Sequence, residues 1–390
     1  MRLPLAVLAP MVSALAHALM LLILARNGTP GDIAQIIALQ AAVAFILTVV
    51  EFGIGRELSV SAARGPASEY QFLNRLHLVG FVTIGSIAAF VVVSAGFGLV
   101  PPLVLIYSVA ERRVSTCLAC SIATGRIVAS SLVLILVRLL ALATLVIVDQ
   151  FSGVDPSMQY LLVTAGSSTA LAVILHFIPR VPQNNERERR SLKLIVSVSW
   201  HYWATTLMGQ ARTLDTAVVT MLVPMPIAAS YALPARSLQP LRLIGTSLAN
   251  VAFPLAARGE RPQVRKLISA AWMGGICSGL LVLLLIPVIP SLVDLVIGPG
   301  YSGASVPLVL FALGAAVNLP GSVISSALQA SGRQRQVTIL GVVLLILQML
   351  SLVLLVKLFS INGAAAAILL TYIAQLLIVV FLYRRHGDGA

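Results

Sequence analysis

The chain alternates long apolar stretches with short breaks that carry glycine, proline or charged residues. Most stretches are about 20 residues long, the length that an α-helix needs to cross the ~30 Å hydrocarbon core of a bilayer. Dividing the chain at these breaks predicts twelve spans, at residues 3–25, 33–50, 76–98, 101–124, 127–148, 157–178, 194–223, 228–256, 267–289, 303–328, 336–356 and 361–383. The pattern therefore predicts an all-α polytopic membrane protein.

Composition excludes a water-soluble protein. Of the 390 residues, 59% are hydrophobic and only 10% are charged, and the mean hydropathy is +1.00. Soluble domains carry about 25% charged residues. The first apolar stretch is longer than the core of a signal peptide and lacks a convincing cleavage site, so we expect it to be retained as the first span.

The basic residues are distributed unevenly between the predicted loops. The chain has 26 Lys and Arg residues against 13 acidic ones, a net charge of +13. If the N-terminus is cytoplasmic, the cytoplasmic side holds 18 of the 26, and the outer side holds two, Arg26 and Lys357. Cytoplasmic loops of membrane proteins are enriched in Lys and Arg. We therefore predict that both termini are cytoplasmic, and that the charge reflects topology rather than nucleic-acid binding.

Short internal matches indicate two related halves. A long cytoplasmic connection at about 179–193 lies near the middle of the chain. Two tetrapeptides and one dipeptide recur six spans later. They are Ala62–Gly65, which recurs as Ala256–Gly259, Pro102–Leu105, which recurs as Pro307–Leu310, and Gly125-Arg126, which recurs as Gly332-Arg333. Six spans per half give both halves the same orientation, as in transporters built from parallel repeats. We predict two six-helix bundles, residues 1–185 and 186–390.

Six arginines fall inside the predicted spans, where only two carboxylates accompany them. The arginines are Arg112, Arg113, Arg138, Arg212, Arg236 and Arg242, and the acids are Glu111 and Asp215. Each charge near the bilayer centre costs roughly 2.5–3.5 kcal/mol on the insertion scale. Such residues must face water, a partner or a ligand, so the cationic surplus suggests an anionic ligand.

Helical periodicity groups several of these residues with other polar side chains. On span 7, Ser197, His201, Thr205, Met208, Arg212 and Asp215 share one face, and on span 8 Arg236, Gln239, Arg242, Thr246 and Asn250 do so. We predict a central, water-filled cationic cavity whose substrate-binding candidates are Arg236, Arg242, Arg212, Arg138, Arg112, Arg113, Gln239, Asn250 and His201. The alternative for each arginine is an ion pair or a carbonyl contact between packed helices, as for Arg212 with Asp215 three residues later.

Other motifs add little chemistry. Cys117 and Cys120 form a CxxC inside an apolar helix without a second ligand pair, so we predict no metal site. No nucleotide-binding or hydrolase motif is present, and we predict neither a cofactor nor enzymatic activity. Gly275 and Gly279 form a GxxxG pattern that predicts close helix packing.

Several motifs resemble those of a known family, mostly from span 7 onward. They are Leu214-Asp215, Ser230–Arg236 with its Tyr and Ala-Arg, Phe253-Pro254, Ile297–Tyr301, Ala327–Gly332 and Ile361–Ala365, with looser matches at Gly31–Ala34 and Glu51–Gly53. With twelve spans in two halves and a cationic interior, the chain resembles the Wzx-type polysaccharide flippases of the multidrug/oligosaccharidyl-lipid/polysaccharide exporter superfamily.

This resemblance implies a fold, a substrate and a location. The two halves would form a V around a central cavity, in a bacterial inner membrane. The cavity would carry a polyprenyl-pyrophosphate-linked oligosaccharide to the outer leaflet by alternating access, without covalent chemistry. The implied partners are this lipid-linked sugar, membrane lipids and a counter-ion, either a proton or sodium. Asp215 and Glu111 are the candidates for coupling, although Asp215 could instead simply neutralise Arg212.

Three other functions stay open at this stage. A drug exporter of the same superfamily should show unpaired acids in its cavity, the opposite of the charge seen here. Flippases for the peptidoglycan precursor usually have two more spans than this length supplies. A membrane-embedded polysaccharide polymerase or glycosyltransferase generally needs a large outer loop with catalytic acids, whereas the predicted outer loops are short.

Overall fold

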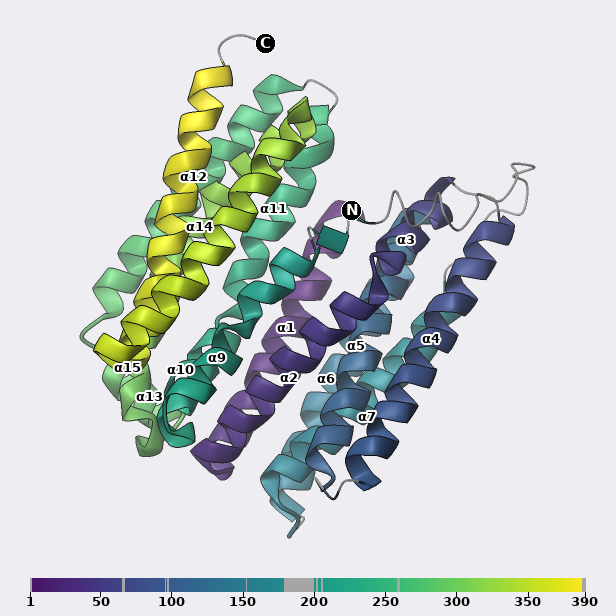
Figure 1. The fold of residues 1–390 in the computed structure, drawn as a ribbon, viewed down its shortest axis with the longest axis vertical. Coiled ribbons are helices and arrows are strands. Elements are labelled where there is room, and N and C mark those ends of the chain that lie inside the picture. The colour runs from purple at the N-terminus through teal and green to yellow at the C-terminus, as the bar shows by residue number, and fades with distance from the viewer. Residues whose placement is uncertain are drawn as a thin grey trace. The chain divides into compact units, whose positions relative to one another are not determined.

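The computed structural model describes residues 2–64, 67–94, 96, 98–151, 153–178, 200, 203–204, 206–257 and 260–387, and all regular structure within them is helical (Figure 1). The chain forms two compact units. The first unit comprises Met1–Met20 and Ile36–Leu214, and the second comprises Leu21–Gln35 and Asp215–Ala390. The C-terminal end of the first helix and the N-terminal end of the second helix thus belong to the second unit. Most of the predicted linker at 179–193 lies outside the described residues, so the predicted boundary at residue 185 stays a prediction.

In the described part of the chain, seven helices precede the linker. They are α1 (Arg2–Asn27), α2 (Pro30–Glu51), α3 (Ile54–Arg64), α4 (Ala67–Ser94), α5 (Val100–Ala123), α6 (Ile127–Phe151) and α7 (Pro156–His176). The start of α7 shows local capping chemistry. At α7, the Asp155 carboxylate accepts a hydrogen bond from the Met158 N–H at 3.0 Å, and Pro156 occupies the first turn, where no N–H is needed.

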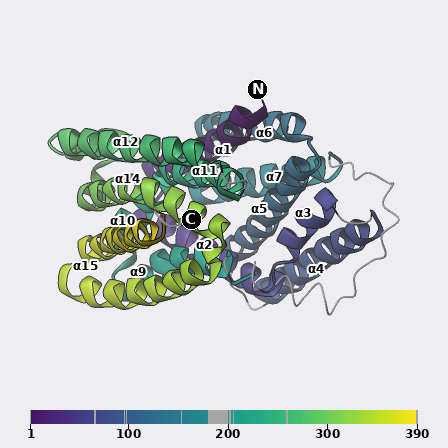
Figure 2. The ribbon, with the colours of Figure 1, turned by 90° about the horizontal axis from the view of Figure 1, so that it is seen from above.

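Helix α5 is the centre of the first unit. It packs against α3, α4, α6 and α7, as the view from above also shows (Figure 2). Val114 and Cys117 of α5, Leu134 of α6 and Leu171 and Leu175 of α7 form one buried apolar cluster. Because α5 contacts each of these four neighbouring helices, polar residues on different faces of α5 meet different partners.

The region between predicted spans 2 and 3 differs from the prediction. We expected a cytoplasmic loop at 51–75, but this segment holds α3 and the first turns of α4. Leu58 and Ala62 of α3 lie one helical turn apart and are buried against Leu73 and Cys120. Two residues with positive φ, Phe52 and Gly53, separate α2 from α3. The sequence obscured this short helix because its apolar face is narrow and charged residues flank it.

The second half contains further helices. After a single 3-10 turn at Arg212–Leu214, they are α9 (Asp215–Leu222), α10 (Met225–Ser237), α11 (Gln239–Ala257), α12 (Arg261–Leu285), α13 (Ile289–Val296), α14 (Ser305–Leu328) and α15 (Gln334–Gly387), with a second 3-10 segment at Pro299–Ala304. Helix α14 is central here and packs against α11, α12 and α15 (Figure 2). A Cβ added to Gly275 of α12 would lie 2.7 Å from the Ala316 carbonyl oxygen of α14. The close packing predicted from the GxxxG pattern is confirmed at this glycine.

Two predicted spans are not continuous α-helices. Span 8 breaks at Leu238 (φ −88°, ψ 4°), between Pro234 and Pro240, because prolines cannot donate the backbone hydrogen bonds of a continuous helix. The predicted stripe on span 8 is therefore not carried by one continuous helix, since Arg236 belongs to α10 and Arg242 to α11. The stripe predicted on span 7 is interrupted likewise by the 3-10 turn that precedes Asp215.

Six segments among the described residues are long and apolar enough, by length and composition, to cross a membrane. They are Leu8–Asn27, Pro30–Glu51, Ile127–Phe151, Pro156–His176, Arg261–Leu285 and Ser305–Arg385. The last is 81 residues long and turns at Gln329–Arg333 and at Ser360 (φ 53°), close to the boundaries predicted between spans 10, 11 and 12. The chain is a multi-pass membrane protein.

The repeated Gly-Arg dipeptides occupy equivalent places in the two halves. Gly125 (φ 74°) follows α5 and Gly332 (φ 86°) follows α14, and the next helix begins within two residues of each glycine. This left-handed backbone conformation is accessible to glycine at little cost. The two helices that precede these turns are also the central helices of their units, which agrees with a relation between span 4 and span 10.

Candidate functional site

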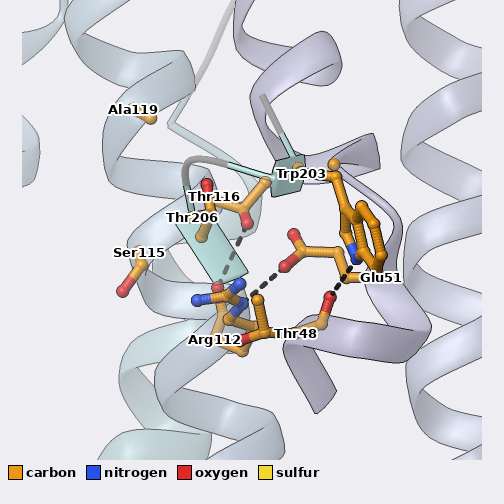
Figure 3. A pocket seen from close by; sticks show the side chains of 10 residues that line it. Thr48, Glu51, Arg112, Ser115, Thr116, Ala119, Trp203 and Thr206 are labelled. Carbon is orange, nitrogen blue, oxygen red and sulfur yellow. Dashed lines mark hydrogen bonds and ion pairs between the residues drawn. The ribbon is translucent and has the colours of Figure 1, made fainter. Parts of the chain in front are cut away.

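A cavity of about 150 Å³ lies beside the end of α2 in the first unit (Figure 3). Its walls include Thr48 and Glu51 of α2, Arg112 and Thr116 of α5, and Trp203 and Thr206. Arg112 Nε donates to Glu51 Oε2 at 2.5 Å, which forms an ion pair inside the cavity. Predicted candidate Arg112 therefore faces a cavity, and its partner is Glu51, which the sequence had marked only through the family motif.

Trp203 closes this cavity by capping α2. The last carbonyl groups of a helix lack intrahelical N–H donors. The Trp203 indole Nε1–H points at the carbonyl oxygens of Thr48 and Val49, at 3.1 and 3.2 Å, and the ring stacks on Phe52 with 5.0 Å between centroids. The segment that contains Trp203 is thus fixed to the first unit. Of the neighbouring candidates, His201 lies outside the described residues.

Arg113 points to a different set of partners from Arg112. Its Nη2 donates to Asn74 Oδ1 at 2.5 Å and to His176 Nδ1 at 2.7 Å, and its Nη1 donates to His77 Nδ1 at 3.2 Å. Arginine has no acceptor, so both histidine Nδ1 atoms must be unprotonated. The His77 proton then lies on Nε2, which is 3.2 Å from Glu51 Oε1. These contacts form a buried polar chain from Glu51 to His176.

Glu111 and Arg138 form a third group. Arg138 of α6 makes an ion pair with Glu111 of α5, and Ser168 of α7 completes a triangle by donating to Glu111 at 2.6 Å and accepting from Arg138 at 3.0 Å. The sequence showed no acidic neighbour for Arg138. The structure supplies one from another helix and leaves Glu111 paired with Arg138 rather than with the arginines adjacent to it in the chain.

The second unit has a buried group around Asp215. Tyr231 donates to Asp215 Oδ2 at 2.9 Å, and the backbone N–H and hydroxyl of Thr216 approach Oδ1 at 2.6 and 3.2 Å. Phe311 packs edge-on against Tyr231, and the Arg242 guanidinium carbon lies 5.3 Å from the centre of the Phe311 ring. The structure therefore brings Asp215 and Arg242 into one neighbourhood through two aromatic side chains.

Arg242 is unusual in this group. Its Nε and Nη2 are buried and have no hydrogen-bond partner among the described residues. The contact with Phe311 is a cation–π interaction, which suits a guanidinium but satisfies none of its N–H donors. Arg242 is therefore a half-buried cation with two buried, N–H-bearing nitrogens left for another acceptor.

The other candidates are more dispersed. Arg212 and Arg236 are half-buried, and each interacts with another residue. Gln239 is exposed at the start of α11. The side chain of Asn250 lies outside the described part of the structure. Sequence reasoning missed the polar partners Asn74, His77, His176, Trp203 and Tyr231. The available signal for His77 and His176 was their place near the predicted cytoplasmic ends of apolar spans.

No protein-family model matches the chain, and no curated protein matches it in sequence. Solved structures match over nearly its whole length. An inward-facing multidrug resistance MATE family transporter of the MOP superfamily is 14% identical, with a TM-score of 0.67 over 97% of this chain and 95% of that one. A mutant form of the Vibrio cholerae MATE transporter VcmN is 13% identical, with a TM-score of 0.66 over 100% of this chain and 95% of that one.

A flippase also matches. The lipid II flippase MurJ, in an inward closed conformation, is 13% identical to this chain, with a TM-score of 0.69 over 97% of this chain and 87% of that one. Identities this low establish the fold and not the substrate. The chain has the fold shared by the MATE transporters and MurJ.

Proposed function

We propose that this protein is a flippase that moves a polyprenyl-pyrophosphate-linked oligosaccharide from the cytoplasmic to the outer leaflet of the plasma membrane. Its fold is found in a lipid II flippase and in multidrug transporters, so the fold supports transport but does not choose the cargo. In this proposal, two six-helix halves expose a central cavity to each side of the membrane in turn. No covalent step is required.

The charge pattern favours an anionic cargo. Glu51, Glu111 and Asp215 each accept hydrogen bonds within their own unit. These three carboxylates are thus already engaged and are less available to an organic cation. Arg242 is the observation that carries the proposal, because two of its buried nitrogens have no acceptor among the described residues. A pyrophosphate supplies several acceptor oxygens in the geometry that a guanidinium fork matches.

The energetics agree with outward movement. A pyrophosphate-linked head group carries about two negative charges, and each gains roughly 2.3 kcal/mol per 100 mV on leaving an inside-negative compartment. We propose Asp215 and Glu111 as the acids that exchange a proton or sodium ion if transport is also coupled to an ion gradient. An imposed pH or sodium gradient across vesicles that contain the protein tests this coupling.

The first prediction concerns Arg242. Flipping is measured in vesicles that contain the protein and a polyprenyl-pyrophosphate oligosaccharide labelled on the sugar. A label that has been flipped becomes accessible to an impermeant quencher, so the quenched fraction reports flipping. We expect Arg242→Ala to slow flipping about tenfold or more, because a charge-assisted hydrogen bond contributes roughly 1.5–3 kcal/mol. Arg242→Lys should recover only part of the rate, since an ammonium lacks the planar fork.

The control is Arg335→Ala, which removes an exposed arginine at the start of α15 and should leave flipping unchanged. Normal flipping by Arg242→Ala would show that this side chain does not contact the cargo. Export of a cationic dye by the wild type, without movement of the lipid-linked sugar, would favour the multidrug alternative. Equal activity on lipid II would favour a peptidoglycan-precursor flippase.

A further inference from the structure

The larger of the two cavities described in the first unit lies between α4, α5 and α7 and has a volume of about 560 Å³. It is separate from the cavity in Figure 3, and the adjacent residues Arg112 and Arg113 each line a different one. Each helix contributes one face to the wall, at positions three or four residues apart. These faces run from Leu78 to Ala89 on α4, from Ile106 to Arg113 on α5 and from Thr169 to His176 on α7.

The cavity has one polar end. Arg113 and His176 are in hydrogen-bond contact, and Arg113 also reaches Asn74 and His77, which directly precede the α4 wall. From this end the wall on α4 continues for eleven residues, about 16 Å of helix at 1.5 Å per residue, and is almost entirely apolar. That length is about half of the ~30 Å hydrocarbon core, the depth of a single leaflet.

Arg113, the cation at the polar end, forms no ion pair with the described residues. Arg113 is only 5% exposed, and its three hydrogen-bond partners are an amide and two imidazoles that must be neutral in order to accept. Its Nε is buried without a hydrogen-bond partner. The nearby acid Glu51 is paired with Arg112 and bonded to His77. A buried guanidinium without an anion is costly, so the site fits an anionic group.

The surroundings favour a lipid over a soluble anion. Beside the cavity on α4, Val79, Ile87 and Phe90 are exposed apolar side chains, as expected for a helix that faces hydrocarbon. We propose that this cavity binds one acyl chain of an anionic phospholipid, with the lipid phosphate beside Arg113 and His176. In the predicted topology the polar end lies toward the cytoplasm, which selects a lipid of the cytoplasmic leaflet. This lipid is bound by one unit and is not the transported cargo.

The test is lipid binding to the purified full-length protein, measured by native mass spectrometry in detergent with added dioleoyl phosphatidylglycerol or phosphatidylcholine. We expect phosphatidylglycerol to bind the wild type about tenfold more tightly, a difference of about 1.4 kcal/mol. Arg113→Gln should abolish this preference, because glutamine keeps hydrogen-bonding capacity but not the charge. Millimolar inorganic phosphate should not displace the lipid.

A second variant tests the apolar wall without touching Arg113. Ala89→Trp fills the far end of the cavity and should weaken phosphatidylglycerol binding about tenfold, a factor equal to about 1.4 kcal/mol, whereas Leu139→Trp, at an exposed site on α6, should not. If Arg113→Gln fails to fold, Ala89→Trp decides the question. Equal binding of both lipids to the wild type, full displacement by inorganic phosphate, or unchanged binding to folded Ala89→Trp would each overturn the proposal.

Discussion

At the scale of single residues, charged side chains of the first unit form ion pairs between helices that are far apart in the chain. Arg138 and Glu111 are 27 residues apart, and Arg112 and Glu51 are 61 apart. Hydropathy shows that such residues lie inside spans, because any charge there stands out. Which charges meet depends on helix packing and rotation, so several of the arginines predicted to line one cavity turn out to hold helices together.

Gly55 gives a prediction at this scale. A Cβ at this position would collide with the Glu51 carboxylate and lie 2.8 Å from Thr116 Oγ1. We expect Gly55→Ala to lower the free energy of unfolding by roughly 1–3 kcal/mol through overpacking, and to disturb the Glu51–Arg112 pair. The measurement is thermal unfolding in detergent.

Gly166→Ala is the matched control, because a Cβ at this exposed position in α7 meets no atom within 4 Å. This variant should be neutral or slightly stabilised, since alanine favours helix over glycine. Equal stability of both variants would show that the α2–α5 contact adjusts freely around the added methyl group.

At the scale of elements, helix existence was predictable and helix continuity was not. Apolar length correctly indicated most helices, and the Gly-Arg dipeptides correctly marked two turns. The breaks at Leu238 and at Arg212–Leu214 fell inside stretches that hydropathy treats as uniform. Pro240 was the available signal for the first break. The short helix α3 was missed because only packing against α5 buries its narrow apolar face.

The contact between α12 and α14 gives the prediction for this scale. Gly275→Ala would place a methyl group against the Ala316 carbonyl oxygen, and we expect a loss of roughly 1–3 kcal/mol in the free energy of unfolding. Its neighbour Gly274 offers a control within the same helix, because a Cβ there would lie 3.9 Å from the flexible Leu319 side chain. Thermal unfolding in detergent should separate the two variants. Equal melting would mean that the helices can move apart without cost.

At the scale of the whole molecule, the chain has the fold of MATE transporters and MurJ, which both match it over nearly its full length. Orientation in the membrane rests on the distribution of basic residues alone. We predict that cysteines introduced at Gly153 and Pro299, in a cysteine-free background, react with an impermeant maleimide in intact cells. Cysteines at Asn184 and Gln334 should react only after the membrane is opened. The reverse pattern would invert the topology.

The three consecutive charges at the middle of α5 have a mechanical consequence. Successive residues of a helix point about 100° apart. Glu111 is tied to α6 and α7, Arg112 to α2, and Arg113 to α4 and α7. Any rotation of α5 about its own axis would strain all three sets of bonds together. These bonds therefore oppose rotation of α5, and the first unit resists internal twisting.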